Sequence, residues 1–459
     1  MQKNYLLDKS VLLYSPYSVF AFDDNHIFIT SETIREMEKA ALTGSGEVRA
    51  NAREFGIIMD DLSRDGSLSD GVLLQNGGTL KVLNTSGYDL IDVCENLDVE
   101  QGVKATIVTR NAFQRVEASL AGIRAEPYKS ESVTTNGDAY EGRCCLYLSA
   151  DEMRFFAKTG YLELDTTKEY YATKHDGTAL PSGYKPSVNE HIIMIPADNP
   201  SGGTMLGLYD GKRIHALRYY KDKSAKPVFG VSAWNVGQVF ALDALLAPAS
   251  EAPLVILKGP AGTAKTFLSV AAALAQTIDQ YHGGENTYRK ILLSRPNVKM
   301  DDDVGYLKGD EVSKVMPALR GLTDNIDNLM ADDKKGSEGS GTLEYLMTKK
   351  VIDLQAMAYM RGRSIGRQYI IIDETQNATI MQILSLITRV GKDTKIVILG
   401  DPDQIDHPYL DSRTNGLCYA SEKMRGSKLC RQITFTEDEC TRSELASEAI
   451  ARLTPKGAL

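Results

Sequence analysis

One short segment constrains the fold of this chain more than any other. Residues 259–266 read Gly-Pro-Ala-Gly-Thr-Ala-Lys-Thr and directly follow the apolar run 254–257. The apolar run predicts a buried strand, and the small apolar residues from Phe267 onward predict a helix packed on a sheet. A loop of this kind between a strand and a helix arranges backbone N–H groups around a phosphate. The segment therefore predicts a phosphate-binding loop in an α/β domain.

The residue types in this loop, called the phosphate loop below, suit a nucleoside triphosphate and Mg²⁺. Glycines allow the chain to turn tightly and to approach phosphate oxygens closely. Lysine is expected to reach the β- and γ-phosphates, and the threonine hydroxyl is expected to ligate Mg²⁺. We expect the nucleotide to be bound by every residue of the loop, that is Gly259, Pro260, Ala261, Gly262, Thr263, Ala264, Lys265 and Thr266.

Ala264 departs from the usual pattern, which has glycine directly before the lysine. A β-carbon is tolerated there only at negative φ, in the first turn of the helix, and we expect that conformation for Ala264. The alternative for the isolated motif is a glycine-rich turn with an incidental lysine.

Two later segments favour the nucleotide site over that alternative. The buried-strand pattern 369–372 ends in Asp373 and Glu374. We expect Asp373 to lie in the Mg²⁺ shell and Glu374 to orient or deprotonate the attacking water. A further strand pattern, 395–399, is followed by a polar loop in which Gln404 is expected to contact the γ-phosphate. Three polar strand ends in this order predict one ATP site.

Length and composition set outer bounds. A chain of 459 residues is too long for one core, so two or three domains are expected. No apolar run of about 18 residues is present, and no signal-peptide pattern opens the sequence, so we expect a protein without a membrane span. Six cysteines without a Cys-x-x-Cys pair indicate reduced thiols in the cytoplasm. The net charge of −9 argues against a general nucleic-acid coat but is compatible with a local basic channel.

The texture of the sequence divides the chain into three expected domains. Strand and helix patterns alternate in residues 1–130, which indicates an α/β domain with parallel strands. Residues 131–230 are rich in turn residues and short strand patterns, which indicates a small β-rich connecting domain. Alternation returns in 231–459, where residues 331–341 form a polar, glycine-rich insertion.

The C-terminal third resembles the PhoH-like ATPase family, a relative of superfamily 1 helicases. The resemblance rests on several motifs besides the phosphate loop: 294–296, 304–310 (with lysine where proline is usual), 360–364, 373–377, 388–391 and 400–406. It implies a RecA-like phosphate-loop NTPase fold that binds ATP and forms a ring, with a hexamer expected. It also implies that Gln238 reads adenine and that Arg442 acts as an arginine finger from a neighbouring subunit. A surface salt bridge is the alternative for Arg442.

The N-terminal domain resembles a PIN domain, the nuclease fold often fused to PhoH, through segments 7–13, 33–38 and 108–111. The resemblance implies a carboxylate cluster that holds Mg²⁺ or Mn²⁺ for phosphodiester hydrolysis. Asp8 and Glu36 match two of its acids, and either Asp89 or Asp92 is the third. Asn111 stands where the family usually has another aspartate.

Two functional interpretations follow from these features. The first is an ATP-dependent RNA-processing enzyme that couples ATP hydrolysis, with RNA unwinding or translocation, to metal-dependent RNA cleavage by the PIN domain. The second is an ATP-gated RNA-binding module, in which Asp8 and Glu36 are only strand and helix caps of a degenerate PIN domain. A small-molecule kinase fits the Asp-Glu-x-Gln and Gly-Asp-x-x-Gln motifs less well. We expect Trp234, the sole tryptophan, to be a core residue near Gln238.

Overall fold

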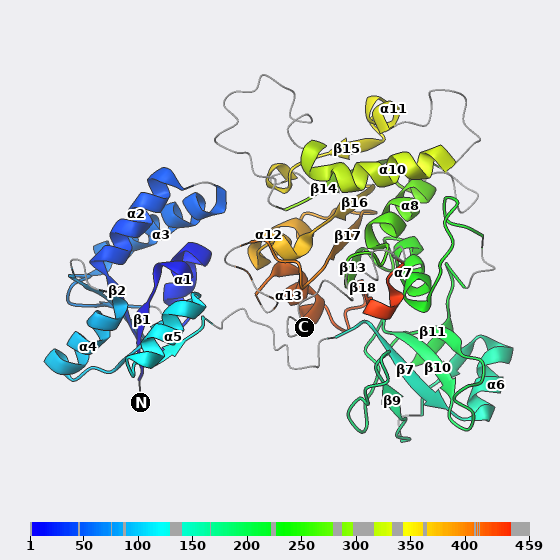
Figure 1. Ribbon diagram of the computed structural model, residues 1–459, viewed down its shortest axis with the longest axis horizontal. Coiled ribbons are helices and arrows are strands. Elements are labelled where there is room, and N and C mark those ends of the chain that lie inside the picture. The colour runs from blue at the N-terminus through cyan, green and yellow to red at the C-terminus, as the bar shows by residue number, and fades with distance from the viewer. Residues whose placement is uncertain are drawn as a thin grey trace, which may run out of the picture. The chain divides into compact units, whose positions relative to one another are not determined.

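The computed structural model folds into two compact units, residues 1–132 and 133–459 (Figure 1). It describes residues 2–44, 46–74, 76–85, 89–128, 140–165, 167–221, 226–278, 287–296, 316–332, 343–360, 365–407, 410, 412 and 414–441.

The first unit is a sheet covered by helices on both faces. Its strand order is β3-β4-β2-β1-β5-β6, and all neighbours are parallel except β3 and β4. Leu6 and Leu7 of β1 point to opposite faces, where they join two separate hydrophobic clusters. The elements are β1 (Asn4–Leu7), α1 (Lys9–Tyr14), η1 (Pro16–Phe20), β2 (His26–Thr30), α2 (Ser31–Thr43), α3 (Gly46–Asp65), β3 (Val72–Leu73), β4 (Thr79–Leu83), α4 (Leu90–Gln101), β5 (Ala105–Val108), α5 (Ala112–Leu120) and β6 (Ala125–Glu126).

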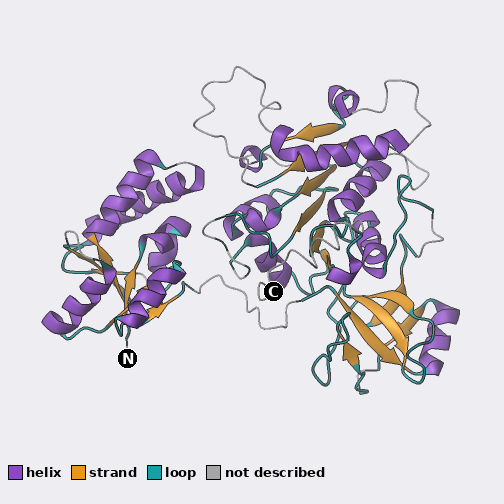
Figure 2. Cartoon of the chain, viewed as in Figure 1, coloured by secondary structure: helices purple, strands orange, loops and turns teal. Residues whose placement is uncertain are grey.

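The second unit begins with a β-rich layer, which we call the connecting sheet (Figure 2). Its order is β8-β12-β11-β10-β7-β9, and all neighbours are antiparallel except β10 and β7. The elements are β7 (Arg143–Leu148), α6 (Ala150–Thr159), β8 (Tyr161–Glu163), β9 (Ala172–Thr173), β10 (His191–Pro196), β11 (Met205–Tyr209) and β12 (Arg213–Ala216).

The rest of the second unit is built on a fully parallel sheet, the C-terminal sheet, with order β15-β14-β16-β17-β13-β18. Its four inner strands, β14, β16, β17 and β13, carry continuous apolar runs because helices bury both faces. The elements are α7 (Val236–Leu246), β13 (Leu254–Lys258), α8 (Lys265–Thr277), β14 (Lys290–Ser294), η2 (Met316–Leu319), α10 (Arg320–Asp332), α11 (Leu343–Thr348), β15 (Ile352–Leu354), η3 (Met357–Met360), β16 (Gln368–Ile372), η4 (Thr375–Asn377), α12 (Ile380–Ile387), β17 (Lys395–Gly400), α13 (Gly416–Lys423), β18 (Cys430–Thr434) and η5 (Glu437–Glu439).

These layers confirm the predicted α/β class. The register pairs Lys258 with Gly400 and Ser294 with Ile372, so the carboxyl ends of β13, β17, β14 and β16 lie along one edge of the C-terminal sheet. All six cysteines are free thiols. Among the described residues, no helix is long and apolar enough to cross a membrane. Residues 333–341 of the predicted polar insertion lie outside the described part of the chain.

The connection between the two sheets of the second unit generates a first prediction. Gly142, just before β7, has φ +76°, and a β-carbon there would lie 1.8 Å from the backbone oxygen of Gln432 in β18. Gly160 has a similar φ of +74° but open space around it. Gly160→Ala should therefore cost only the left-handed penalty of about 1–2 kcal/mol. Gly142→Ala should cost about 1–3 kcal/mol more, because the strands must also separate.

Thermal unfolding of the full-length variants measures this difference. A lower melting temperature for Gly142→Ala than for Gly160→Ala is expected. Equal melting temperatures would show that the close approach of residue 142 to β18 is absent.

Candidate nucleotide site

The phosphate loop is held in its turn by close backbone contacts. Gly259 has φ +136°, and a β-carbon there would lie 2.6 Å from the backbone oxygen of Phe435. Lys265 Nζ donates to the carbonyl oxygens of Gly259 and Pro260, at 2.7 Å each, and to Thr263 Oγ1 at 3.2 Å. Burial lowers the pKa of Lys265, and nearby carboxylates, first of all Asp401, oppose that shift. The lysine is thus already centred over the loop.

Ala264 contradicts its prediction. Its φ of +67° and ψ of +19° place it in the left-handed region, as the N-cap of α8, whereas negative φ was expected. The reason is the geometry of the turn: the chain must reverse here so that α8 can begin, and Leu268 N then donates to Ala264 O at 2.9 Å. The turn requires a left-handed backbone conformation at residue 264, and this conformation is strained for alanine because of its β-carbon.

Thr266 and Asp373 meet across the sheet edge. Thr266 Oγ1 donates to Asp373 Oδ2 at 3.2 Å, and the second oxygen of Asp373 accepts from Glu374 N at 2.9 Å. Burial, followed by the negative charge of Glu374, raises the pKa of Asp373 to about 6. A hydroxyl and a carboxylate are oxygen ligands of the type that Mg²⁺ takes alongside phosphate and water, so these two residues fit the ion.

Gln376 joins the predicted catalytic residues to each other. This fully buried side chain donates through Nε2 to Glu374 Oε2 at 2.6 Å and to Gln404 O at 2.8 Å. Its Oε1 accepts from Asp401 N at 3.1 Å. A β-carbon at Gly400 would lie 2.1 Å from Gln376 Oε1, so glycine at the end of β17 makes room for the amide.

Asp401 links Gln404 to the phosphate loop. Its Oδ2 accepts from Gln404 Nε2 at 2.9 Å and from Ala261 N at 3.0 Å. Gln404, predicted to contact the γ-phosphate, therefore reaches the loop through Asp401. Neither Gln376 nor Asp401 was among the predicted site residues. The available signal was their place in the motifs Asp-Glu-Thr-Gln and Gly-Asp-Pro-Asp-Gln.

Gln238 lies in the first turn of α7. Its side chain is buried, and its Oε1 accepts from Trp234 N at 2.8 Å, while Asn235 caps the helix by accepting from Gln238 N. The prediction of a core position for Trp234 is wrong, because this side chain is 72 % exposed. The buried ring in this region is that of Tyr220, whose hydroxyl accepts from Ala233 N at 2.9 Å.

In the first unit, the two predicted metal ligands Asp8 and Glu36 form hydrogen bonds with neighbouring residues of the domain. Asp8 caps α1, and its Oδ2 accepts from Ser10 N at 3.1 Å and from Thr109 Oγ1 at 2.9 Å. Glu36 accepts from Lys9 Nζ at 2.5 Å. Each acid therefore already has a local partner.

The other candidates lie at helix starts. Asp89 caps α4 and Asn111 caps α5, whereas Asp92 lies in the first turn of α4. Among the described residues, no three His, Cys, Asp or Glu side chains lie close enough together to hold a metal ion. The structure therefore does not assemble the predicted PIN acids into one metal-binding group.

Some predicted features lie outside the described residues. They are Arg442, the motif 304–310, and residues 361–364 of the motif 360–364.

Comparison with known proteins identifies both parts of the chain. A model of the PhoH-like protein family matches residues 230–454, and a model of the PIN domain matches residues 5–129. The protein PhoH2 of Bacillus subtilis (strain 168) is 33 % identical over 469 residues, which cover 98 % of this chain and 99 % of that protein. The chain belongs to the PhoH2 family.

Other PhoH2 proteins are similar over the same length. Those of Thermobispora bispora and Mycolicibacterium smegmatis are 26 % and 25 % identical, and the matches cover 97 % and 100 % of this chain and 95 % and 98 % of the relatives. The predicted fusion of a PIN domain to a PhoH-like domain is thus confirmed. Residues 259–266 lie within the PhoH-like match, and PhoH is an ATPase-type domain.

The conformation of Ala264 generates a second prediction. Ala264→Gly should raise stability by about 1 kcal/mol, because glycine relieves the left-handed strain, which exceeds its entropic cost. Ala261 is the matched control in the same loop, since its φ is not positive. Ala261→Gly should lower stability by about 0.4–1 kcal/mol.

Melting temperatures of the two variants without nucleotide test this prediction: the value should rise for Ala264→Gly and fall for Ala261→Gly. Destabilisation by both substitutions would contradict the left-handed assignment of residue 264.

Proposed function

We propose that this PhoH2 protein is an ATP-dependent RNA-processing enzyme, in which ATP hydrolysis by the second unit drives RNA unwinding or translocation and the PIN domain cleaves RNA. The observation that carries the ATPase part is the convergence of Thr266, Asp373 and Glu374 with Lys265 at the carboxyl edge of one parallel sheet. Ligands of open α/β sheets bind at this edge.

Each residue then has a chemical task. Lys265 would exchange its contacts with the loop carbonyls for β- and γ-phosphate oxygens. Thr266 and Asp373 would hold Mg²⁺, which supplies charge neutralisation when bound. Glu374 would orient the attacking water and accept its proton, and Gln376 would fix the rotamer of Glu374 through the 2.6 Å hydrogen bond.

Asp401 and Gln404 supply a route from the nucleotide to the rest of the domain. Asp401 accepts hydrogen bonds from the phosphate loop and from Gln404 through the same oxygen. A displacement of Ala261 when the γ-phosphate binds or leaves would therefore change the position of Gln404. A change in the position of Gln404 could in turn alter the segments of the domain that contact RNA.

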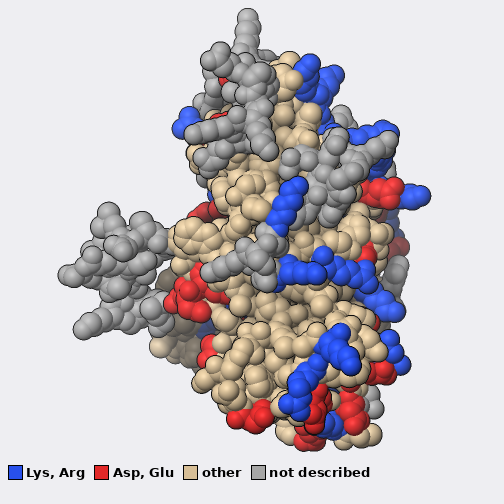
Figure 3. Space-filling model, turned by 90° about the vertical axis from the view of Figure 1, so that its right-hand side faces the viewer, with Lys and Arg blue, Asp and Glu red and all other residues tan. Residues whose placement is uncertain are grey.

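The RNA part of the proposal rests on family membership and on charge distribution. Although the chain is acidic overall, several Lys and Arg side chains run together across the middle of the face in Figure 3, with acidic side chains mainly at its margins. Basic bands of this kind bind phosphate backbones. A ring-shaped homo-oligomer, with a hexamer expected, would let Arg442 act on the ATP of a neighbouring subunit.

Cleavage by the PIN domain would require Asp8 and Glu36, with Asp89 or Asp92, to leave their present partners and come together around Mg²⁺ or Mn²⁺. The helix-capping role of Asp8, Asp89 and Asn111 favours a second candidate, an ATP-gated RNA-binding module with a degenerate PIN domain. On that alternative, ATP changes RNA affinity and no strand is cut.

ATP turnover tests the nucleotide site. Lys265→Ala should lower the ATPase rate by about 10²–10³-fold, the range found when one charge-stabilising donor is removed. Glu374→Gln should lower kcat by about 10²–10⁴-fold and leave ATP binding intact, because it removes proton transfer and keeps the side-chain shape. Lys212→Ala, which removes a 70 % exposed lysine paired with Glu163, should leave the rate unchanged.

RNA should raise the wild-type rate if the domain is a motor. Turnover that survives Lys265→Ala would contradict the nucleotide-site assignment, and a rate that stays flat over a wide RNA series would favour the gated binder.

Cleavage of labelled RNA in Mg²⁺ or Mn²⁺, with and without ATP, tests the PIN domain. Asp8→Asn should abolish cutting and keep the fold, because asparagine also caps helices well. Asn111→Asp should increase cutting, because it adds a negative charge and preserves the cap of α5. Asp98→Asn, an exposed position on α4, is the control and should cut like the wild type.

Absence of cutting by both the wild type and Asn111→Asp would select the ATP-gated binding module. Equal cutting by the wild type and Asp8→Asn would identify a contaminating nuclease.

A further inference from the structure

A buried ion pair joins the connecting sheet to the short helix η5, which follows the last strand of the C-terminal sheet. Arg143 at the start of β7 donates through its two terminal nitrogens to both oxygens of Glu439 in η5, at 2.7 and 2.6 Å. The two side chains are 0 % and 2 % exposed. Two parallel charge-assisted hydrogen bonds fix the orientation of the carboxylate as well as its position.

The same carboxylate holds the start of α7. Glu439 Oε1 accepts from Gly237 N at 2.8 Å, and the backbone oxygen of Glu439 accepts from Asn235 Nδ2 at 3.1 Å. A β-carbon at Gly237 would lie only 2.5 Å from Glu439 Oε1. The carboxylate therefore fits because residue 237 is glycine, and the next residue is Gln238.

The two residues after Glu439 bind the phosphate loop. Thr441 donates to Gly262 O from both its backbone N, at 2.9 Å, and its Oγ1, at 3.1 Å. Cys440 Sγ lies 3.6 Å from Ala261 O, its hydrogen-bond acceptor. One short segment thus contacts the helix that carries Gln238 and the loop that carries Lys265.

We infer that Glu439, oriented by Arg143, is a positioning residue that sets the spacing between the phosphate loop and Gln238, the residue that the family resemblance implies reads adenine. This inference rests on the proposed role of the site in binding ATP. ATP must contact Gln238 and the phosphate loop at once, so its affinity depends on the distance between them. The affinity of a ligand that binds only the phosphate loop does not depend on that distance.

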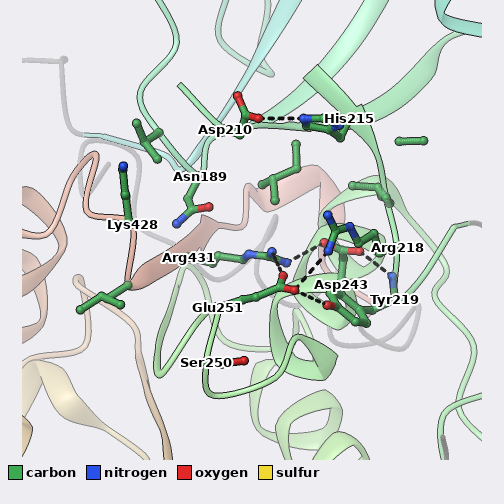
Figure 4. A pocket seen from close by; sticks show the side chains of 15 residues that line it. Asn189, Asp210, His215, Arg218, Tyr219, Asp243, Ser250, Glu251, Lys428 and Arg431 are labelled. Atoms are coloured by element: carbon green, nitrogen blue, oxygen red, sulfur yellow. Dashed lines mark hydrogen bonds and ion pairs between the residues drawn. The ribbon is translucent and has the colours of Figure 1, made fainter. Parts of the chain in front are cut away.

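A second buried ion-pair cluster supplies a control. Arg431 in β18 contacts Asp243 of α7 and Glu251, at 3.1 Å each, beside a pocket of about 390 Å³ (Figure 4). Asp243 also accepts from Tyr219 N at 3.1 Å and lies 3.6 Å from His191 Nε2, so this cluster likewise connects α7 to the connecting sheet. Asp243 and Glu251, the acceptors of Arg431, both lie outside the phosphate loop.

The experiment compares two ligands, ATP and inorganic tripolyphosphate, by calorimetry with the full-length chain in Mg²⁺. Glu439→Gln should weaken ATP binding at least about tenfold and change tripolyphosphate binding by less than about threefold. Gly237→Ala should do the same, because its methyl group displaces the carboxylate while alanine remains compatible with a helix. Arg431→Gln should lower the melting temperature and leave the ratio of the two affinities within about twofold of the wild type.

Unchanged ATP affinity in both variants would overturn the inference, as would an equal loss for both ligands, which indicates general destabilisation. A wild type that binds ATP no more tightly than tripolyphosphate would also overturn it, since no base subsite would then exist. These results are separate from turnover: wild-type ATP binding without hydrolysis would contradict the proposed function alone.

Discussion

The parallel pairing of β13, β16 and β17 is the constraint on which the candidate site depends. Each strand carries an apolar run that is buried between helices, and the polar residues of the candidate site follow that run at its carboxyl end. Parallel pairing brings those ends together, which places Lys265 and Thr266 beside Asp373, and the loop after Gly400 beside both. A shift in strand register would separate these residues even if every helix stayed intact.

Buried polar side chains give this edge its rigidity. Gln376 forms hydrogen bonds with residues that follow β16 and β17. Asp401, which follows β17, also accepts a hydrogen bond from the phosphate loop. Groups of this kind are costly when unpaired, so the network favours one arrangement strongly. The glycine at position 400 is part of the same arrangement, because any β-carbon would collide with the Gln376 amide.

Features set by contiguous residues could be predicted from the sequence. The strand before the phosphate loop, the acids after β16 and the α/β class all follow from local hydrophobic patterns and are found in the structure. The conformation of Ala264 could not be predicted, because it depends on how the loop packs against Phe435 and starts α8. The exposure of Trp234 could not be predicted either, since Tyr220 fills the neighbouring core.

Contacts between residues far apart in the chain could not be predicted from the sequence either. Arg143 and Glu439 are 296 positions apart, and neither belongs to a motif that suggests a pair. In the PIN domain, residue type did suggest metal ligands. The same carboxylates can also cap helices, however. The sequence alone could not decide between metal binding and helix capping, because position 111, where the family usually has aspartate, is asparagine.

The contacts of Lys265 have a consequence for nucleotide exchange. Its ammonium group donates hydrogen bonds to two carbonyl oxygens of its own loop, so the loop itself supplies acceptors for its cation. In the proposed ATP site, phosphate oxygens would replace these carbonyl oxygens around the ammonium group. The net gain from such a contact would be the difference between the phosphate–ammonium interaction and the two carbonyl hydrogen bonds that are lost, so the internal contacts of Lys265 would moderate the affinity of the proposed site.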